Sequence, residues 1–351
     1  MKVYENEQYL SDVKYVAGLE LPWEKLQNRS VMISGATGLV GSFLVDVLLE
    51  KNKDGLNCTV YALGRNEQRA KERFSYCAGD KLVFIPYDIN KPLVRDDMGT
   101  VDYILHLASN THPMAYATDP IGTITTNIIG IQNMLEFAAE HNASRCAFTS
   151  SCEIYGENRG DVEKFDEKYC GYIDCNTMRA GYPESKRCGE ALCQAYIKQK
   201  GLDIVIPRLT RSYGPTLLKT DTKALSQFIS KGVSREDIVL KSAGTQYYSY
   251  LYIADTVAGL LTVLLKGETG EAYNIADDRS DIMLRDLAAI IAEKAGTKVI
   301  FELPDEVEKS GYSTATKARL DSAKIQKLGW TAKYDIRGGI DRTIDILSTC
   351  E

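Results

Sequence analysis

Two residues placed four positions apart, Tyr182 and Lys186, have the right chemistry to act together as a general base. They open a stretch with a helical pattern, from Pro183 to Gln199, so both side chains are expected on one face of a helix. A free tyrosine ionises near pH ~10, and a neighbouring ammonium group favours the phenolate. We therefore predict a lowered pKa for Tyr182, which would accept a proton near neutral pH. Taken alone, the spacing also fits an ordinary surface helix.

Ser151 and Glu153 are the second candidate group. They lie in the segment from Phe148 to Gly156, which is expected to reach the carboxyl edge of a parallel sheet, where sites of α/β proteins lie. In an extended strand, residues two apart point to the same face. The sequence therefore predicts that both side chains reach the same substrate. The alternative is that Glu153 only hydrogen-bonds a substrate hydroxyl or a neighbouring loop.

Three glycines predict a phosphate-binding turn between an apolar strand and an amphipathic helix. Gly35 permits the tight turn, Gly38 lets the backbone approach a pyrophosphate, and Gly41 allows close packing of the helix on the strand. The helix N-terminus adds unpaired N–H groups and the positive end of a dipole. A plain strand-to-helix turn explains one glycine but not three at this spacing. The turn residues Thr37, Leu39 and Val40 are predicted to contact the same dinucleotide.

The end of the second expected strand bears on the choice between NAD and NADP. An NAD site usually places an acid there to bind the ribose 2′-hydroxyl, but this chain has Gly64 followed by Arg65. An arginine pairs well with a 2′-phosphate, with Arg69 as a possible helper. The alternative is a solvated surface arginine. NAD and NADP therefore both remain open.

The elements that must position these residues alternate between short β-rich runs and longer helical patterns, which predicts a doubly wound, Rossmann-type parallel sheet with helices on both faces. The expected strands are Ser30–Ser34, Cys58–Leu63, Leu82–Tyr87, Tyr103–Leu107, Arg145–Ser150 and Asp203–Leu209. The expected helices are Ser42–Glu50, Glu67–Tyr76, Thr123–Glu140, Pro183–Gln199, Thr222–Lys231, Ile253–Lys266, Leu284–Ala295 and Asp335–Leu347.

We predict a division into an N-terminal arm (1–29), a dinucleotide-binding domain (30–208) and a smaller mixed α/β substrate-binding domain (209–351). The segment 250–276 is expected to return to the dinucleotide-binding domain. The arm carries an amphipathic stretch, Tyr9–Val16, which is expected to pack on the body of the chain, with an oligomer contact as the alternative.

Composition excludes several classes of protein. The chain has 351 residues, a net charge of −6 and no dense basic block, so a nucleic-acid partner is unsupported. The longest near-apolar run, Thr256–Leu265, is shorter than a membrane span, and no signal peptide opens the sequence, so we expect a cytoplasmic protein without a membrane partner. Nine cysteines without a CxxC pair predict reduced thiols and no metal site.

The turn Gly35-Ala36-Thr37-Gly38-Leu39-Val40-Gly41 resembles the GxxGxxG turn of extended short-chain dehydrogenases/reductases. In that family, Asp88-Ile89 resembles the pair that holds adenine, and Leu107-Ala108-Ser109 the turn under the nicotinamide ribose. Further motifs point to the nucleotide-sugar branch, the epimerase/dehydratase family: His106 to Ser109, Asp119-Pro120, Asn127, Gly130, Asn133, Ser151 to Gly156, Tyr182 with Lys186, Tyr213-Gly214-Pro215, and Gly244 with Gln246. Within the branch the chain looks most similar to UDP-glucuronate decarboxylases.

The resemblance implies a tightly bound NAD or NADP, a nucleotide-diphosphate-sugar substrate, a homodimer and a place in polysaccharide biosynthesis. It implies that Tyr182 is the base, with Ser151 as hydrogen-bond partner and Lys186 as pKa-lowering group and ribose ligand. Asn127 is implied as a cofactor contact. Hydride transfer from sugar C4 would give a 4-keto sugar. This species is then reduced again (4-epimerase), loses water (4,6-dehydratase) or loses carbon dioxide (decarboxylase).

Glu153 resembles the glutamate of the dehydratases and decarboxylases, whereas common 4-epimerases lack it. Three residues depart from the family pattern. Cys152 stands where dehydratases have an aspartate, Arg211 replaces an asparagine, and Tyr248 replaces an arginine that lies near the reacting end and diphosphate of decarboxylase substrates. Ser109, Cys152, Glu153, Arg211 and Tyr248 are the predicted substrate contacts. Arg211 could pair with a diphosphate from a different wall or with a carboxylate of the chain.

Two other functions remain as alternatives. One is a simple NADPH-dependent carbonyl reductase, which would use the same Ser-Tyr-Lys chemistry with an exchanging cofactor. The other is a non-catalytic dinucleotide sensor, against which the intact set of Ser151, Tyr182 and Lys186 argues.

Overall fold

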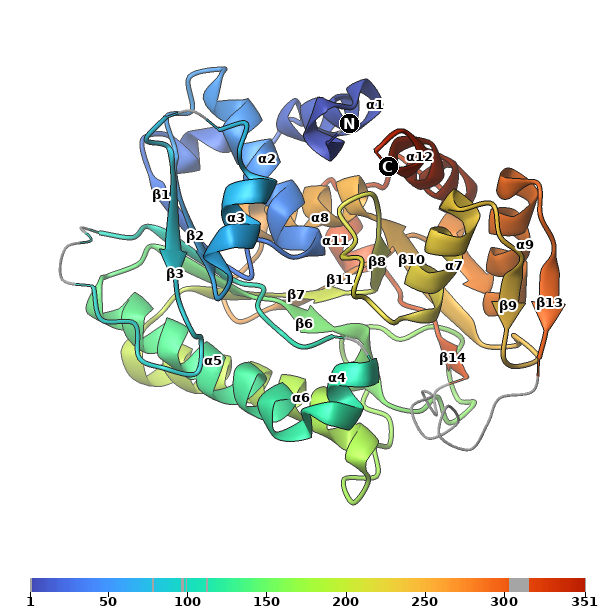
Figure 1. The fold of residues 1–351 in the computed structure, drawn as a ribbon. Helices are drawn as coiled ribbons and strands as arrows, with labels where there is room; N and C mark the ends of the chain where they lie inside the picture. The colour runs from blue at the N-terminus through green and yellow to red at the C-terminus, as the bar shows by residue number, and fades with distance from the viewer. Residues whose placement is uncertain are drawn as a thin grey trace.

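The structure is a computed structural model that describes residues 2–77, 79–95, 98, 100–111, 113–302 and 316–350. Its centre is a wholly parallel sheet, for which the described residues provide eight strands (Figure 1). These are β1 (Ser30–Ser34), β2 (Thr59–Gly64), β3 (Leu82–Pro86), β4 (Tyr103–His106), β5 (Arg145–Phe148), β6 (Ser150–Ser151), β7 (Ile204–Leu209) and β11 (Ala272–Ile275).

The strand order is β11-β7-β5-β4-β1-β2-β3, with β6 beside β7. The chain runs outward from β1 to β2 and β3, and then returns to the other side of β1 as β4. The connections after β1 and β4 therefore leave in opposite directions, and a crevice forms at the carboxyl ends of these two strands. This topology confirms the predicted Rossmann-type fold.

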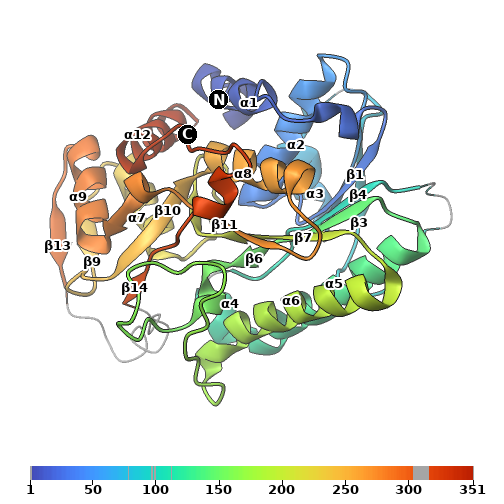
Figure 2. The same cartoon turned by 180° about the vertical axis from the view of Figure 1, so that it is seen from behind.

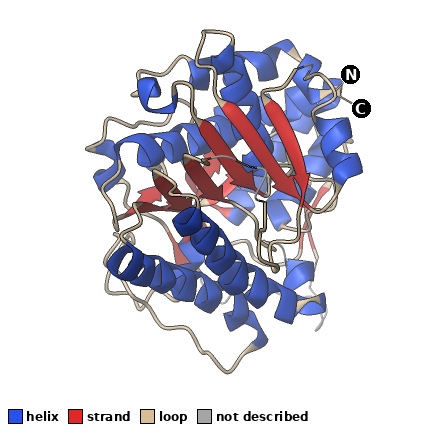
Figure 3. Cartoon of the chain, turned by 90° about the vertical axis from the view of Figure 1, so that its left-hand side faces the viewer, coloured by secondary structure: helices blue, strands red, loops and turns tan. Residues whose placement is uncertain are grey.

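Helices cover both faces of the sheet (Figure 3). On one face lie α1 (Glu7–Ala17), α2 (Leu39–Asn52) and α8 (Ile253–Lys266), and on the other lie α5 (Pro120–Glu140) and α6 (Gly181–Lys200). The side chains of β1 explain this arrangement, since successive residues point to opposite faces. Val31 and Ile33 join the core beneath α2 and α8, whereas Met32 joins the core beneath α5.

A second, smaller sheet stands beside the first. It contains β8 (Arg211–Tyr213), β10 (Tyr247–Tyr252), β12 (Asp281–Met283) and β14 (Lys317–Ala318), in the order β12-β10-β14 with β8 beside β10. A parallel pair, β9 (Ile238–Leu240) and β13 (Val299–Phe301), lies outside it. Three helices cover these strands: α7 (Ala224–Val233), α9 (Leu284–Ala295) and α12 (Ile336–Thr349).

Short elements complete the described chain. They are the helices α3 (Glu67–Arg73), α4 (Pro113–Thr118) and α11 (Ala323–Gln326), and the 3-10 turns η1 (Val3–Glu5), η2 (Trp23–Leu26), η3 (Cys152–Tyr155), η4 (Met178–Ala180) and η5 (Asp278–Ser280). None of the described helices is long and apolar enough to span a bilayer.

The N-terminal arm packs on the body of the chain, as the amphipathic pattern of Tyr9–Val16 predicted. Asp12 of α1 is fully buried and accepts hydrogen bonds from the hydroxyls of Tyr252 and Tyr334, and Arg342 of α12 pairs with it. Helices α1 and α12 consequently lie side by side, close to both termini (Figures 1 and 2). The buried Asp12 carboxylate thus helps to hold the N-terminal helix against the C-terminal one, together with a hydrogen bond from Asn6 to Thr349.

Two observations bear on the predicted domains. Strand β11 pairs with β7 at the edge of the large sheet, so part of the segment 250–276 contributes to that sheet. The boundary expected after residue 208 falls inside β7, which ends at Leu209. The division into an arm and two domains stays a prediction.

Candidate active site

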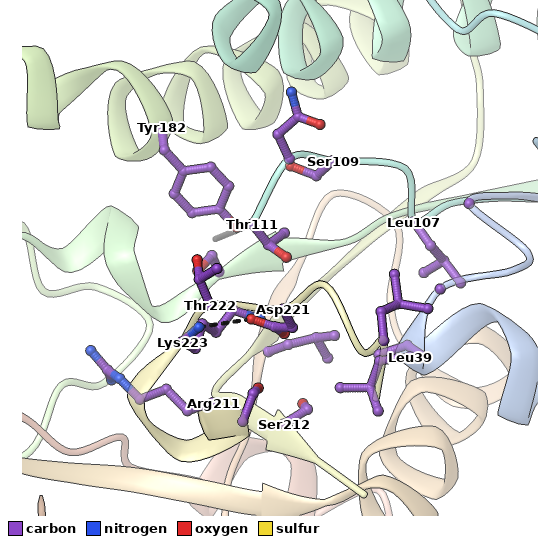
Figure 4. Close-up of a pocket in the computed structure, with 18 of the residues that line it drawn as sticks. Leu39, Leu107, Ser109, Thr111, Tyr182, Arg211, Ser212, Asp221, Thr222 and Lys223 are labelled. Atoms are coloured by element: carbon purple, nitrogen blue, oxygen red, sulfur yellow. Dashed lines mark hydrogen bonds and ion pairs between the residues drawn. The ribbon is translucent and has the colours of Figure 1, made fainter. Parts of the chain in front are cut away.

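A single cleft of about 1500 Å³ holds almost all the predicted site residues. It opens at the carboxyl ends of β1 and β4 and extends to the second sheet. The predicted residues that line it are Gly35, Thr37, Gly38, Leu39, Val40, Gly41, Arg65, Asp88, Ile89, Leu107, Ala108, Ser109, Ser151, Cys152, Glu153, Tyr182, Lys186, Arg211 and Tyr248. In the close-up of Figure 4, Leu39 and Leu107 lie toward one end of the cleft, and Tyr182 and Arg211 toward the other.

The glycine turn follows the geometry that the sequence predicted. Gly35 has φ +72°, and a Cβ there would stand 2.9 Å from the backbone nitrogen of Ala108. A Cβ at Gly41 would stand 2.3 Å from the carbonyl oxygen of Gly35, so the helix could not approach the strand. At Gly38 the nearest atom is the Gly35 oxygen at 3.3 Å. Gly38, which lines the cleft, is therefore less tightly constrained by backbone atoms than Gly35 or Gly41.

Helix α2 begins at this turn with a free positive end. Gly38 is its N-cap, no side chain caps it, and its first turn carries no acidic residue. Unpaired N–H groups and the helix dipole therefore favour an anion at this point of the cleft. The turn fits the diphosphate of a nicotinamide dinucleotide, which Gly38, Leu39 and Val40 would hold.

Sequence reasoning missed Ser34, which organises the loop opposite the glycine turn. Its hydroxyl oxygen accepts hydrogen bonds from the backbone N–H groups of Leu107 (3.1 Å) and Ala108 (3.2 Å), and it contacts His106 Nδ1 at 2.9 Å. Burial, followed by the charge of Lys186, lowers the pKa of His106 to about 3. His106 is therefore a neutral structural residue, and Ser34 fixes the loop that passes along the cleft.

Asn127, the expected cofactor contact, is not among the residues that line the cleft, and its contact with a cofactor stays a prediction. It is fully buried in α5, accepts a hydrogen bond from Ser109 Oγ (2.7 Å) and donates one to Ser185 Oγ (2.9 Å). Ser185 in turn donates to the carbonyl oxygen of Tyr182 at 2.8 Å. The amide thus ties the Ser109 loop to the first turn of α6.

Tyr182 and Lys186 project from one face of α6, as their spacing predicted, and both are buried. The Lys186 ammonium lies 6.0 Å from the centre of the Tyr182 ring and donates a hydrogen bond to the Thr149 carbonyl oxygen (2.9 Å). The expected lowering of the Tyr182 pKa is wrong for this structure. Burial and then the negative charge of Glu153 raise that pKa, although a hydrogen bond with Ser151 acts in the opposite direction. Burial also lowers the pKa of Lys186 to about 7.

Ser151 and Glu153 line the same cleft but are not on one extended strand. β6 ends at Ser151, and the 3-10 turn η3 follows. The Ser151 hydroxyl accepts a hydrogen bond from the Glu153 backbone N–H (3.2 Å), a local capping contact that competes with an extended strand. The premise of strand alternation is therefore wrong, and the turn brings Glu153 to the cleft instead.

Glu153 has a partner to which sequence reasoning assigned no role. Arg179 donates to both carboxylate oxygens, at 3.0 and 2.8 Å, and its guanidinium also lies 4.8 Å from the centre of the Tyr116 ring. Tyr116 stacks on Tyr182 with ring centres 5.2 Å apart. The only signal in the sequence was the position of Arg179, three residues before the expected base. Arg179 thus links the two residues: it pairs with Glu153 and contacts the Tyr116 ring, which in turn stacks on Tyr182.

The three residues that depart from the family pattern meet in the cleft. The guanidinium of Arg211 lies 3.6 Å from the centre of the Tyr248 ring, and Arg211 Nη1 lies 3.6 Å from Cys152 Sγ. No carboxylate among the described residues lies within ion-pair distance of Arg211, so the alternative of a structural ion pair within the described chain is not supported. Burial raises the pKa of the Cys152 thiol, which keeps it neutral.

At the far end of the cleft lie the residues expected to contact the adenosine. Arg65 is exposed after β2, and Asp88 accepts a hydrogen bond from the backbone N–H of Asn90 (3.1 Å). Ile89 packs so closely on α5 that a Cβ at Gly130 would stand 2.9 Å from it. The loop before α7 supplies the opposite wall of the cleft, with an ion pair between Asp221 and Lys223 (Figure 4).

The doubly wound sheet, the glycine turn at its switch point and the Ser-Tyr-Lys set in one cleft define a dinucleotide-binding enzyme of the short-chain dehydrogenase/reductase type. A sequence model of the NAD dependent epimerase/dehydratase family matches residues 31–276, and the chain belongs to this family. The predicted enzyme class and nicotinamide cofactor are thereby confirmed.

Two curated relatives are UDP-glucuronic acid decarboxylases. The decarboxylase 3 of Arabidopsis thaliana is 31% identical over 318 residues, which cover 89% of this chain and 87% of the relative. The decarboxylase 1 of Xenopus tropicalis is 29% identical over 324 residues, which cover 90% of this chain and 71% of the relative.

Solved structures share the fold. A dTDP-glucose 4,6-dehydratase from Streptomyces venezuelae with NAD bound gives a TM-score of 0.77 at 24% identity, over 90% of this chain and 96% of that one. A UDP-glucuronic acid 4-epimerase from Bacillus cereus, in complex with UDP-glucuronic acid and NAD, gives 0.75 at 22% identity, over 91% and 99%. Proteins named for three different reactions, a decarboxylation, a 4,6-dehydration and a 4-epimerisation, therefore resemble this chain.

Proposed function

We propose that the protein converts a nucleotide-diphosphate sugar through a 4-keto intermediate, with NAD retained throughout the cycle. The observation that carries this proposal is the gathering of Ser151, Tyr182 and Lys186 in the same cleft as the glycine turn. That cleft continues to the second sheet and to the loop before α7, which provides room for a second nucleotide-sized ligand beside the cofactor. The names of the relatives and of the solved structures support the same substrate class.

Bound NAD supplies a hydride acceptor beside the sugar. Tyr182 accepts the proton of the 4-hydroxyl group, and Ser151 hydrogen-bonds the phenolic oxygen and the sugar hydroxyl. The hydrogen bond from Ser151 lowers the pKa of Tyr182 and so opposes the raise that burial and Glu153 cause. Burial lowers the pKa of Lys186 to about 7, so below that pH its ammonium group is charged and would hydrogen-bond the ribose of a bound nicotinamide nucleotide beside the base. Burial of Tyr182 and Lys186 keeps water away from the transferred proton.

Glu153 acts after hydride transfer as an acid or base that handles the sugar beyond C4. Arg179 fixes the carboxylate in one orientation toward the cleft and balances its charge. A 4-epimerase needs no such group, so the presence of Glu153 favours a dehydratase or a decarboxylase. Decarboxylation of a nucleotide-linked uronic acid is the second candidate, because the curated relatives carry that name, although Tyr248 stands in place of the family arginine.

The test is to incubate the purified protein with UDP-, dTDP-, GDP- and CDP-sugars and to follow the products by mass spectrometry. Loss of water, loss of carbon dioxide and an unchanged mass with a new stereoisomer identify the three reactions. Net consumption of NADPH on a simple carbonyl compound, without any change in the sugars, would establish the reductase instead. No turnover of any nucleotide sugar would favour the dinucleotide sensor.

Glu153→Gln separates the roles of this carboxylate. The amide keeps the shape and one acceptor for Arg179 but removes the titration. In a dehydratase or decarboxylase, the variant reduces its bound cofactor on addition of substrate and then stalls, and the absorbance of reduced nicotinamide accumulates. Turnover at the wild-type rate would show that Glu153 is not catalytic, and the 4-epimerase would become the better assignment.

We also propose that the protein is a cytoplasmic homodimer that contacts its partner through α5 and α6, as the resemblance implies. Ile121, Ile124 and Ile129 of α5 are large apolar side chains exposed on this surface. Light scattering of Ile121→Glu and Ile129→Glu variants tests the contact, because charges there would shift a dimer toward monomers. An unchanged molar mass would contradict the proposed surface.

A further inference from the structure

At the sugar end of the cleft, Arg211 has no carboxylate partner among the residues that the structure describes. Arg211 begins β8, which pairs in parallel register with β10, so that Arg211 lies opposite Tyr250. Tyr248, two residues earlier on β10, offers the face of its ring to the guanidinium at 3.6 Å. A guanidinium that stacks on a ring still directs its N–H groups outward in its own plane, where they can donate hydrogen bonds to the oxygens of an anion.

The other arginine in this part of the cleft differs in a decisive respect. Arg179 satisfies both oxygens of Glu153, and the pair is largely buried, with side-chain exposures of 19% and 23%. In the described part of the chain, Arg211 has no such ion pair, and its hydrogen-bond contact is the weak acceptor Sγ of Cys152 at 3.6 Å. A buried charge is costly without a charged partner. The structure thus leaves one positive charge available to a ligand.

The position of the charge indicates which end of the substrate it meets. Cys152 lies between Ser151 and Glu153, so the guanidinium of Arg211 stands beside the reacting group rather than beside the helix N-terminus that receives the cofactor diphosphate. Two lysines, Lys223 and Lys241, line other parts of the same cleft, away from the contact between Arg211 and Cys152.

We propose that Arg211, held flat on Tyr248, is a specificity residue that binds a carboxylate on the sugar, so that the substrate is a nucleotide-linked uronic acid. This inference rests on the proposed function and narrows its substrate class. A neutral hexose leaves the charge of Arg211 unpaired, whereas a uronic acid forms a bidentate, charge-assisted contact with it. The same arginine therefore selects for the acid and against the hexose.

The test measures binding of UDP-glucuronic acid, UDP-glucose and UDP to the NAD-loaded protein by calorimetry. Because a hydrogen-bonded charge pair in a site changes affinity by about 10–100-fold, the wild type should prefer the acid over the hexose by that factor. Arg211→Gln should abolish the preference and change binding of UDP-glucose and UDP by less than about threefold. Arg337→Gln, on the exposed surface of α12, is the matched control and should keep the preference.

Other outcomes overturn the inference. An equal loss of affinity for all three probes in Arg211→Gln would show that the arginine binds the diphosphate. Equal binding of acid and hexose by the wild type would show that no carboxylate is recognised, while the proposed function stands. Failure of the wild type to bind any of the three would overturn the inference, whereas the product screen with dTDP-, GDP- and CDP-sugars would still decide the proposed function. If Arg211→Gln does not fold, Arg211→Lys keeps the charge without the fork, and it must still lower the preference several-fold.

Discussion

Substitutions of two glycines in the same turn should separate the stability of the fold from its affinity for NAD. Gly41→Ala places a methyl group 2.3 Å from the Gly35 oxygen and 2.8 Å from the Ala36 Cα. Both atoms are backbone, so no side chain can rotate away. An overlap this deep costs about 3 kcal/mol, the upper end for overpacking, and the better helix propensity of alanine returns up to about 1 kcal/mol.

The net loss of about 2 kcal/mol should lower the melting temperature of the NAD-free protein by about 4–8 °C, at about 2–4 °C per kcal/mol. Gly38→Ala is the matched variant. Its methyl group would lie 3.3 Å from the Gly35 oxygen, in a residue with φ −82° that alanine readily adopts. We expect a change in melting temperature below about 2 °C. The methyl group would, however, stand where the diphosphate approaches the helix N-terminus.

Loss of one charge-assisted hydrogen bond at that point should weaken NAD binding to Gly38→Ala by about 10–100-fold. Melting curves must be recorded on cofactor-stripped protein, because bound NAD stabilises the fold by mass action. NAD affinity is then measured by calorimetry. The reasoning fails if Gly38→Ala destabilises the stripped protein as much as Gly41→Ala does, or if it binds NAD as the wild type does.

Three other changes test the remaining parts of the site and the fold. Tyr182→Phe removes the proton acceptor without emptying the cleft, so turnover should fall by about 10²–10⁴-fold while the NAD content of the purified protein is largely retained; near-normal rates would refute the base. Arg65→Ala should weaken binding of NADP about tenfold or more and leave binding of NAD unchanged in fluorescence titrations, whereas equal affinities in both proteins would make Arg65 a surface residue. Burial raises the pKa of Asp281 to about 6, so its stabilising protonated form is lost as the pH rises from about 4 to about 6. Asp281→Asn should therefore melt progressively higher than the wild type across that range, and a difference independent of pH would contradict this assignment.

The large sheet and the glycine turn could be predicted because their causes are local in the sequence. Strands buried on both faces give continuous apolar runs, and a backbone contact of 2.3 Å admits only glycine at Gly41. The helices Ile253–Lys266 and Leu284–Ala295 have the predicted ends. In these cases the apolar period, the caps and the steric limits all point to the same structure.

Errors arose where a contact between distant or unexpected partners decides the outcome. The extended strand through Glu153 fails because the Ser151 hydroxyl captures the backbone N–H two residues on. The pKa of Tyr182 depends on burial and on the position of Glu153, neither of which a YxxxK spacing reveals. The hydrogen bonds that Asn127 makes with Ser109 and Ser185 were also outside the reach of the sequence, because they join three separate segments of the chain.

The side of the cleft formed by the second sheet is harder to predict from the sequence, because its side chains are brought together by strand pairing and not by closeness in the sequence. Arg211 and Tyr248 stack only because β8 lies beside β10 in one particular register. Only one residue, Thr210, separates β7, which ends at Leu209 in the large sheet, from β8 in the second sheet. The Thr210 hydroxyl donates a hydrogen bond to the Ser249 carbonyl oxygen (2.7 Å) of β10. This one-residue connection fixes the position of β8 relative to the large sheet. Substitutions at Arg211 or Tyr248 can therefore change which sugar is bound while the reacting groups on the large sheet keep their geometry.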